Sequence, residues 1–229
     1  DCLLSRGLGD VYKRQTLKLL SGILYPTSGE VLVNGFVPWE RKNEFKRSFA
    51  IVMGQKNQLW WDLPASDSLY LNKCIYDVDD REYKKTVDEL SELLGVRELM
   101  NIQVRRLSLG ERMKMEILAA LIHRPGILFL DEPTIGLDIV SQQKIRDFLH
   151  YYNEQTKTTI ILTSHYMRDI EALCSRAVII NSGTLVYGGA LSDINHRMGD
   201  KRLLTLSFSS PVETGKLSIF GRVRENKDL

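Results

Sequence analysis

The segment from Ile127 to Asp138 constrains the fold more than any other part of the sequence. Its first four residues are apolar and lead directly into two adjacent carboxylates, Asp131 and Glu132, and a proline. A short continuous apolar run is typical of a strand buried on both faces of a parallel sheet. Carboxylates at the C-terminal end of such a strand lie where open α/β sheets bind ligands.

Neighbouring residues on a strand point to opposite faces, so the two carboxylates can do different work. One of them, Asp131 or Glu132, can hold a hydrated Mg²⁺, while the other faces the water that attacks a phosphoryl group. The alternative is a strand that merely ends in a solvated acidic turn.

Composition indicates an ordinary globular protein. The 229 residues fit one large domain, or one domain and the start of another; 43% are hydrophobic and 26% are charged. A net charge of +2 gives no support for a surface that coats nucleic acid. The three cysteines form no CxxC pair, which favours a reducing compartment without structural zinc. No run approaches the roughly 18 apolar residues of a membrane-spanning helix, and Leu3-Leu4 is too short a core for a signal peptide.

Strands and helices alternate along the chain, which predicts an α/β fold with a parallel core sheet and βαβ units. The predicted strands are 30–35, 49–53, the run from 127, 159–163, 178–180 and 185–186. The predicted helices are 81–94, one opened by a capping box at Ser108, and 141–152. Residues 67–122 are mostly helical and are expected to form a separate lobe. After Asp200 the pattern changes, and we interpret 203–229 as the truncated start of an appended C-terminal domain.

Four segments follow one another along the chain in an order that is typical of one protein family. They are Gln55 after a strand, the run from Leu107 to Glu111, the carboxylate segment 127–138, and His165 after a strand. In this respect the chain resembles the ATP-binding cassette (ABC) ATPases, the nucleotide-binding subunits of ABC transporters, over about residues 16–197. The resemblance implies a P-loop NTPase-like sheet core with a helical subdomain and a small antiparallel β portion. It also implies ATP and Mg²⁺ as cofactors, and hydrolysis of ATP to ADP and phosphate.

The resemblance gives roles to individual residues. It implies that Asp131 holds Mg²⁺ through water and that Glu132 is the general base for the attacking water. His165 is expected to contact the γ-phosphate. Gln55 is expected to touch Mg²⁺ and water and to sense a membrane partner. Asp138 lies in the loop that crosses to a second subunit. Taken alone, the Gln and the His are also compatible with ordinary polar residues at strand ends.

Ser108 and Gly110 match the ABC signature, where the family has Leu-Ser-Gly-Gly-Gln and this chain has Leu-Ser-Leu-Gly-Glu. A helix N-terminus with a serine hydroxyl and a glycine that lets the backbone approach is a good phosphate site. In the family that phosphate belongs to ATP held by the opposite subunit. The simpler interpretation is a well-capped helix.

The front of the chain departs from the family pattern. Lys13 falls at the place of the phosphate-loop lysine and is a candidate ATP ligand, but Tyr12 replaces the second glycine of that loop. Arg14 replaces the Mg²⁺-binding Ser/Thr and cannot ligate the metal. Two explanations remain open: residues 1–15 are a foreign segment in place of the phosphate loop, which we favour, or the chain is a degenerate cassette. We expect weak or no ATPase activity from the chain as it stands.

Trp60 and Trp61 come shortly after Gln55. They are either buried in the helical lobe or part of a groove that receives a coupling helix from a membrane permease, where aromatic residues serve as anchors. The segment resembles cassettes of ABC-2 type exporters. The resemblance further implies a second cassette, identical or not, and attachment to the cytoplasmic face of the membrane, with no nucleic-acid partner. Alternatives are a soluble ABC ATPase of DNA repair or translation, and an inactive cassette. The transported substrate is set by membrane subunits and does not follow from this sequence.

Overall fold

The computed structural model describes residues 2–4, 9–54 and 58–198. The chain divides into two compact units, Asp1–Asp193 and Ile194–Leu229. The predicted appended domain, residues 203–229, lies outside the described residues, and of the second unit only residues 194–198 are described.

The described elements are six strands, eight α-helices and three short 3₁₀ helices. The strands are β1 Cys2–Leu4, β2 Phe49–Met53, β3 Ile127–Asp131, β4 Thr159–Thr163, β5 Arg176–Asn181 and β6 Thr184–Ala190. The helices are α1 Gly9–Leu20, α2 Asn43–Ser48, α3 Ala65–Tyr76, α4 Asp80–Leu93, α5 Leu109–Leu121, α6 Ile139–Thr156, α7 Met167–Leu173 and α8 Leu191–Met198. The 3₁₀ helices are η1 Pro38–Glu40, η2 Arg97–Leu99 and η3 Val104–Arg106.

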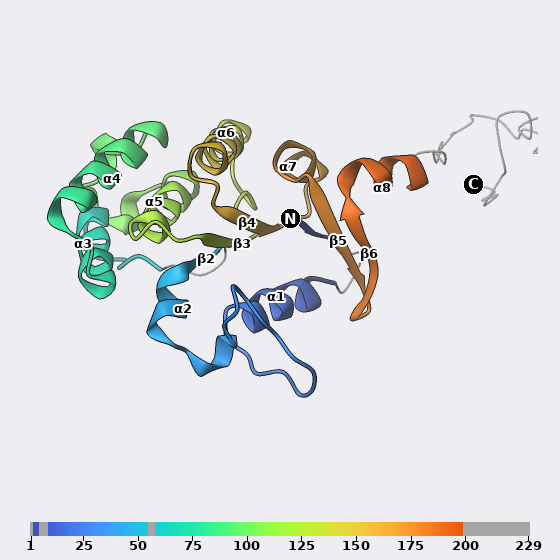
Figure 1. Ribbon diagram of the computed structural model, residues 1–229. Helices are drawn as coiled ribbons and strands as arrows, with labels where there is room; N and C mark the ends of the chain where they lie inside the picture. The colour runs from blue at the N-terminus through green and yellow to red at the C-terminus, as the bar shows by residue number, and fades with distance from the viewer. Residues whose placement is uncertain (1, 5–8, 55–57, 199–229) are drawn as a thin grey trace, which may run out of the picture. The chain divides into compact units, whose positions relative to one another are not determined.

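The strands form one sheet in the order β2-β3-β4-β1-β5-β6, and Figure 1 shows it between layers of helices. All neighbouring pairs are parallel except β5 and β6. The predicted α/β class, with a parallel core and a small antiparallel portion, is therefore confirmed. β1 lies between β4 and β5 and pairs with both, so residues within the segment 1–15 complete the sheet. The origin of that segment stays a prediction.

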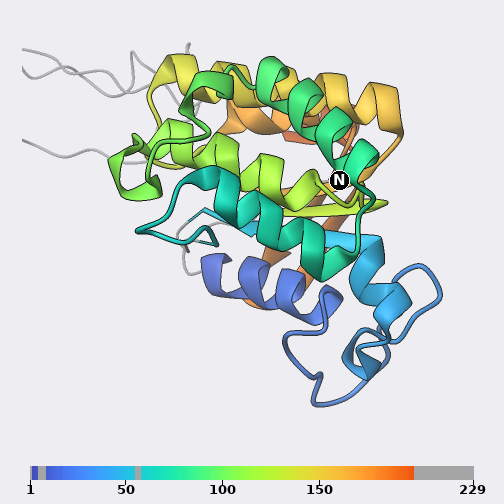
Figure 2. The ribbon, with the colours of Figure 1, turned by 90° about the vertical axis from the view of Figure 1, so that its left-hand side faces the viewer.

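β3 is buried on both faces, as its continuous apolar run predicts. Figures 1 and 2 show α1 and α2 on one side of the sheet and α5, α6 and α7 on the other. Ile127 and Phe129 pack in one core cluster with Leu17 of α1 and Phe45 of α2. Because side chains alternate along a strand, Asp131 points to this same α1 side.

α3, α4 and α5 occupy the stretch predicted as a helical lobe, and we keep that name for them; that they form a separate lobe stays a prediction. α4 begins after Asp79, whose carboxylate accepts a hydrogen bond from the N–H of Arg81 at 2.8 Å. The capping box predicted at Ser108 is confirmed: its hydroxyl accepts from the N–H of Glu111 at 3.3 Å, and the Glu111 carboxylate accepts from the N–H of Ser108 at 2.9 Å. α5 therefore starts where the sequence indicates.

The predicted strand at residues 30–35 is wrong. The structure has only one isolated bridge there, between Val33 and Phe36, around a turn in which Asn34 and Gly35 have φ of 50° and 77°. A strand is stabilised by a hydrogen-bonded neighbour, and within the described residues this segment pairs only with itself. β-propensity alone was therefore insufficient.

Glu116 is a carboxyl on α5 that is 3% exposed, and burial raises its pKa from 4.5 to about 7, against the opposing effects of Arg112 and a backbone hydrogen bond from Gln58. Because the pKa is higher in the folded chain, ionising this group opposes folding, and stability falls as pH rises from 4.5 to about 7. We predict that Glu116→Gln is more stable than the parent at pH 8, by up to about 3 kcal/mol, and equally stable near pH 4.5.

Urea unfolding across this pH range measures the difference. Glu82→Gln on α4, where the side chain is exposed, is the control and should follow the parent at every pH. A constant difference between Glu116→Gln and the parent at all pH values contradicts the prediction.

Candidate functional site

The carboxyl ends of β2, β3 and β4 meet at one edge of the sheet. Their parallel register places Met53, Asp131 and Thr163 side by side. The Thr163 hydroxyl donates to Asp131 Oδ1 at 2.7 Å. The next backbone N–H, that of Glu132, donates to the carbonyl and the hydroxyl oxygens of Thr163 at 3.2 and 3.1 Å. Strand pairing therefore fixes the position of the carboxylate pair.

Both carboxylates face residues of α1, which differs from the prediction that they point to opposite sides. β3 ends at Asp131, and Glu132 has a left-handed φ of 55°, so strand alternation does not extend to it. Arg14 Nε lies 3.0 Å from Asp131 Oδ2, and Lys13 Nζ lies 3.5 Å from Glu132 Oε1. Successive residues of one helix thus neutralise two successive carboxylates, the last residue of β3 and the residue that follows it.

His165 joins this cluster from the end of β4. Its Nε2 lies 3.3 Å from Glu132 Oε1, and its backbone N–H donates to Glu132 Oε2 at 3.3 Å. Glu132 is 2% exposed and Lys13 is 1% exposed, whereas 41% of the His165 side chain is exposed. The structure therefore brings together four predicted site residues, Lys13, Asp131, Glu132 and His165, with an imidazole between the buried carboxylate and solvent.

The helix that carries Lys13 begins four residues earlier, at Gly9. From Lys13 onward its backbone N–H groups bond within the helix, so they are not directed at a ligand as in a glycine-rich phosphate loop. The Tyr12 ring packs against the turn between β5 and β6: a Cβ added at Gly183 would lie 3.3 Å from Tyr12 Cε1. The described part of this segment offers a cationic helix where the family pattern has a phosphate loop.

The surroundings of Asp131 do not fit Mg²⁺ in this chain. One carboxylate oxygen accepts from Thr163 and the other from the guanidinium of Arg14. Position 14 supplies a cation where an oxygen ligand would be needed. Within residues 2–4, 9–54 and 58–198, no group of three or more His, Cys, Asp or Glu side chains is placed to hold a metal ion.

Gly110 and Asp138 meet at a second place, the N-terminus of α6. Asp138 Oδ1 accepts from the N–H of Ser141 at 2.9 Å, and hydrogen bonds from Ser141 lower the pKa of Asp138. A Cβ at Gly110 would lie 2.4 Å from Ser141 Oγ. Gly110 is therefore required by the close approach of α5 to α6 within the chain. Ser108 caps α5 next to it, and Gln55 lies outside the described residues.

Gly54 contributes to the site and was not singled out from the sequence. Its N–H donates to the carbonyl of Asp131 at 2.8 Å. A Cβ at Gly54 would lie 2.4 Å from the carbonyl oxygen of Glu132. The sequence does carry a signal for it: a glycine directly after a buried strand often marks a place where another backbone approaches closely. Thr163 was also missed, although it ends a predicted neighbouring strand.

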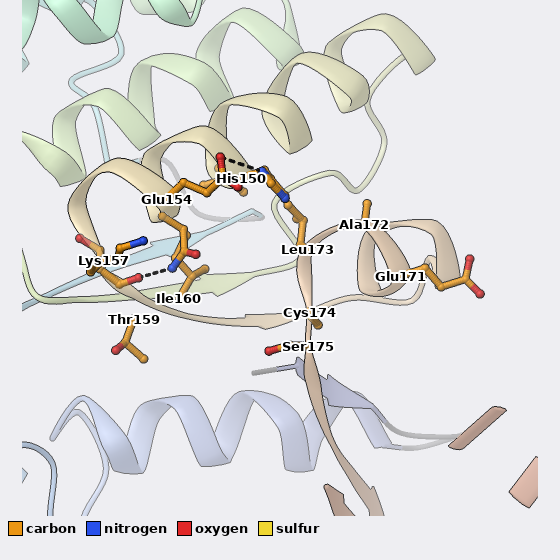
Figure 3. A pocket seen from close by; sticks show the side chains of 13 residues that line it. His150, Glu154, Lys157, Thr159, Ile160, Glu171, Ala172, Leu173, Cys174 and Ser175 are labelled. Carbon is orange, nitrogen blue, oxygen red and sulfur yellow. Dashed lines mark hydrogen bonds and ion pairs between the residues drawn. The ribbon is translucent and has the colours of Figure 1, made fainter. Parts of the chain in front are cut away.

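A cavity of about 510 Å³ lies elsewhere in the unit. Figure 3 shows it between the C-terminal ends of α6 and α7 and the first residues of β4, with His150, Glu154 and Cys174 among its lining residues. It opens at the amino end of β4, whereas the carboxylate cluster lies at the carboxyl end. None of the predicted site residues lines it, so it is separate from the candidate site.

Comparison with known proteins agrees with this arrangement. The ABC transporter family model matches residues 13–135. The chain belongs to the ABC transporter family. It is 34% identical over 182 residues to the ABC transporter ATP-binding protein NatA of Bacillus subtilis, covering 80% of this chain and 74% of NatA. It is 33% identical over 207 residues to the linearmycin resistance ATP-binding protein LnrL of the same organism, covering 90% of this chain and 66% of LnrL.

A solved ATP-binding subunit of an ABC transporter superposes with a TM-score of 0.75 at 25% identity, covering 86% of this chain and 81% of that structure. The chain is thus an ATP-binding subunit of an ABC transporter and a member of an ATP-hydrolysing family. Across the described part of the chain, no helix is both long enough and apolar enough to span a membrane.

Gly54 provides a test of how tightly this cassette packs around its carboxylates. We predict that Gly54→Ala lowers the free energy of unfolding by about 1–3 kcal/mol, because the new methyl group would press on the carbonyl of Glu132. Denaturant unfolding measures the change. Gly188→Ala is the control, since a Cβ there has no atom within 4 Å. Equal effects of the two substitutions would refute the packing argument.

Arg14 provides a test of the disagreement with Mg²⁺. We predict that Arg14→Ser makes ATP binding depend on Mg²⁺, with at least about tenfold tighter binding when the metal is present, because Asp131 Oδ2 loses its guanidinium partner. Titration calorimetry with and without Mg²⁺ measures this, and Arg14→Lys, which keeps the charge, is the matched control. The prediction is contradicted if Mg²⁺ raises the ATP affinity of the parent chain as much as that of Arg14→Ser.

Proposed function

We propose that this cassette energises export through a separate membrane permease and works as one of two cassettes that bind ATP between them. The observation that carries the proposal is the buried Glu132 carboxylate, flanked by Lys13 and His165 at the carboxyl ends of the central strands. This is where open α/β sheets bind ligands. Family membership supplies ATP as the substrate.

Glu132 is the proposed general base. Its Oε1 lies near both Lys13 Nζ and His165 Nε2. A triphosphate would compete with Glu132 for both side chains, because phosphate oxygens are strong acceptors for Lys and His. Once Lys13 turns to the phosphate, Glu132 is left to accept a proton from the attacking water, and His165 lies beside it to contact the γ-phosphate.

A second cassette is proposed to face the N-termini of α5 and α6. Ser108 is exposed there, and the neighbouring apolar side chains Leu109, Ile139 and Val140 are 38%, 74% and 66% exposed. Adjacent exposed apolar side chains indicate a protein interface. In this proposal Ser108, Gly110 and Asp138 complete the ATP site of the partner cassette, which is either a second copy or a related chain.

The permease is proposed to dock on α3 and the segment before it. Trp60 and Trp61 are 56% and 46% exposed, so the alternative that both are buried in the helical lobe is wrong. Tyr70 and Ile75 of α3 are also exposed, at 57% and 61%. Aromatic side chains on such a surface are suited to anchor a cytoplasmic helix of an ABC-2 type permease. The cassette would then lie on the cytoplasmic face of the membrane.

One observation favours a second candidate, a cassette that binds nucleotide without hydrolysing it. Arg14 holds Asp131 where the family places Mg²⁺, and α1 replaces the phosphate loop. For the chain as it stands we therefore expect weak or no turnover. Mg²⁺ enters the proposal only for a chain that carries Ser or Thr at position 14.

The test restores the front of the site with Tyr12→Gly and Arg14→Ser and then adds Glu132→Gln. We predict that phosphate release falls by at least about 100-fold while ATP binding persists and dimers accumulate, because the base is lost and the fold is retained. Phosphate assays and light scattering measure turnover and mass. Glu171→Gln, an exposed change on α7, is the control. If Glu132→Gln hydrolyses ATP as fast as its parent variant, Glu132 is not the general base.

A further inference from the structure

Asp169, in the first turn of α7, is the centre of a buried polar network that the proposed chemistry does not use. The residue is 1% exposed. Its Oδ2 accepts from the hydroxyl of Thr134 and from the hydroxyl of Ser164, the latter at 2.9 Å. Its Oδ1 accepts from Arg146 Nη1 of α6 at 2.8 Å. A single carboxylate therefore binds three donors from three different segments.

The two hydroxyl donors lie next to the residues of the candidate site. Thr134 is two residues after Glu132, and Ser164 is directly before His165. The Ser164 oxygen also accepts from the N–H of Tyr166 at 3.0 Å, which closes the turn that carries His165. Asp169 therefore ties the segment after β3 to the segment after β4, on the far side of both from α1.

The charges of the network are fully matched. Arg146 is 7% exposed, and its second terminal nitrogen donates to Gln143 Oε1 at 2.9 Å. A buried ion pair is seldom the strongest way to stabilise a core, because apolar residues of the same volume often serve as well or better. Its particular property is geometry, since charge-assisted hydrogen bonds fix the positions of the groups they join.

We infer that Asp169, held by Arg146, is a positioning residue that sets the placement of Glu132 relative to His165. Glu132 Oε1 and His165 Nε2 are 3.3 Å apart and belong to different loops, one after β3 and one after β4. Their separation therefore depends on the groups that hold the two loops together. Gln142 supports one loop by donating to the carbonyls of Thr134 and Leu137. Asp169 contacts both loops, through Thr134 and through Ser164. The consequence for hydrolysis rests on the proposed function; the positioning itself does not.

Hydrogen exchange on the chain as it stands tests the positioning. Asn at position 169 cannot accept from the two hydroxyls and also from the guanidinium, since its amide nitrogen is a donor. We expect Asp169→Asn to speed amide exchange of His165 and Tyr166, and of Ile135 and Leu137 after β3, at least tenfold. The amides of Phe129 and Ile161 within the strands should keep their parent rates. Asp67→Asn, an exposed change on α3, is the matched control and should change none of them.

Two further variants separate the loops. Thr134→Val removes one donor and should speed exchange after β3 while leaving His165 and Tyr166 near parent rates. Thr134→Ser keeps the hydroxyl and should restore the parent pattern. Unchanged exchange in both loops of Asp169→Asn would overturn the inference. Exchange that rises equally in the loops and in β3 and β4 would also overturn it, because that pattern marks a merely structural residue.

The turnover arm uses the variant with Tyr12→Gly and Arg14→Ser. There Asp169→Asn should lower kcat for ATP at least tenfold and leave KM within threefold, because the hydrogen bonds of Asp169 go to Thr134, Ser164 and Arg146 and not to the proposed ATP ligands. A raised KM with unchanged kcat would contradict positioning. If the chain with Tyr12→Gly and Arg14→Ser alone hydrolyses no ATP, the proposed function fails. The hydrogen-exchange pattern then still decides the role of Asp169.

Discussion

The parallel pairing of β3 with β2 on one side and β4 on the other is the constraint on which the rest of the site depends. It sets Asp131 beside Thr163 and fixes the backbone of Glu132 through two hydrogen bonds to the same threonine. The end of β4 then delivers His165 to the carboxylate. A slip of one residue in this register would turn Asp131 to the other face of the sheet and away from α1.

Charge compensation from a single helix is the second controlling feature. Two almost fully buried carboxylates are unfavourable unless cations accompany them, and α1 supplies Lys13 and Arg14 at consecutive positions. The two pairs differ in kind. In the proposed function Lys13 leaves Glu132 for a phosphate, so that contact is expected to be exchangeable. Arg14 binds Asp131, the proposed metal carboxylate, and its guanidinium cannot be deprotonated.

Local patterns in the sequence were sufficient for the elements that carry the site. The apolar runs gave β2 and β4 at their observed bounds, and the capping box gave the start of α5. Contacts between distant segments were not predictable in this way: Arg14 and Asp131 are 117 positions apart, and Thr134 and Asp169 are 35 apart. The left-handed backbone at Glu132 was missed because a non-glycine residue seldom adopts it. The segment 30–35 was misjudged because a strand depends on a neighbour that local sequence does not reveal.

The close contact of Gly54 with the peptide after β3 has a mechanical consequence. Gly54 joins β2 to the chain that continues toward Trp60, Trp61 and α3, and it hydrogen-bonds the carbonyl of Asp131 with no room for a methyl group between the two backbones. Two main chains in such contact cannot move far independently, so a displacement of Gly54 would displace the peptide that links Asp131 to Glu132. The end of β2 and the end of β3 are therefore coupled through their backbones, whatever side chains stand nearby.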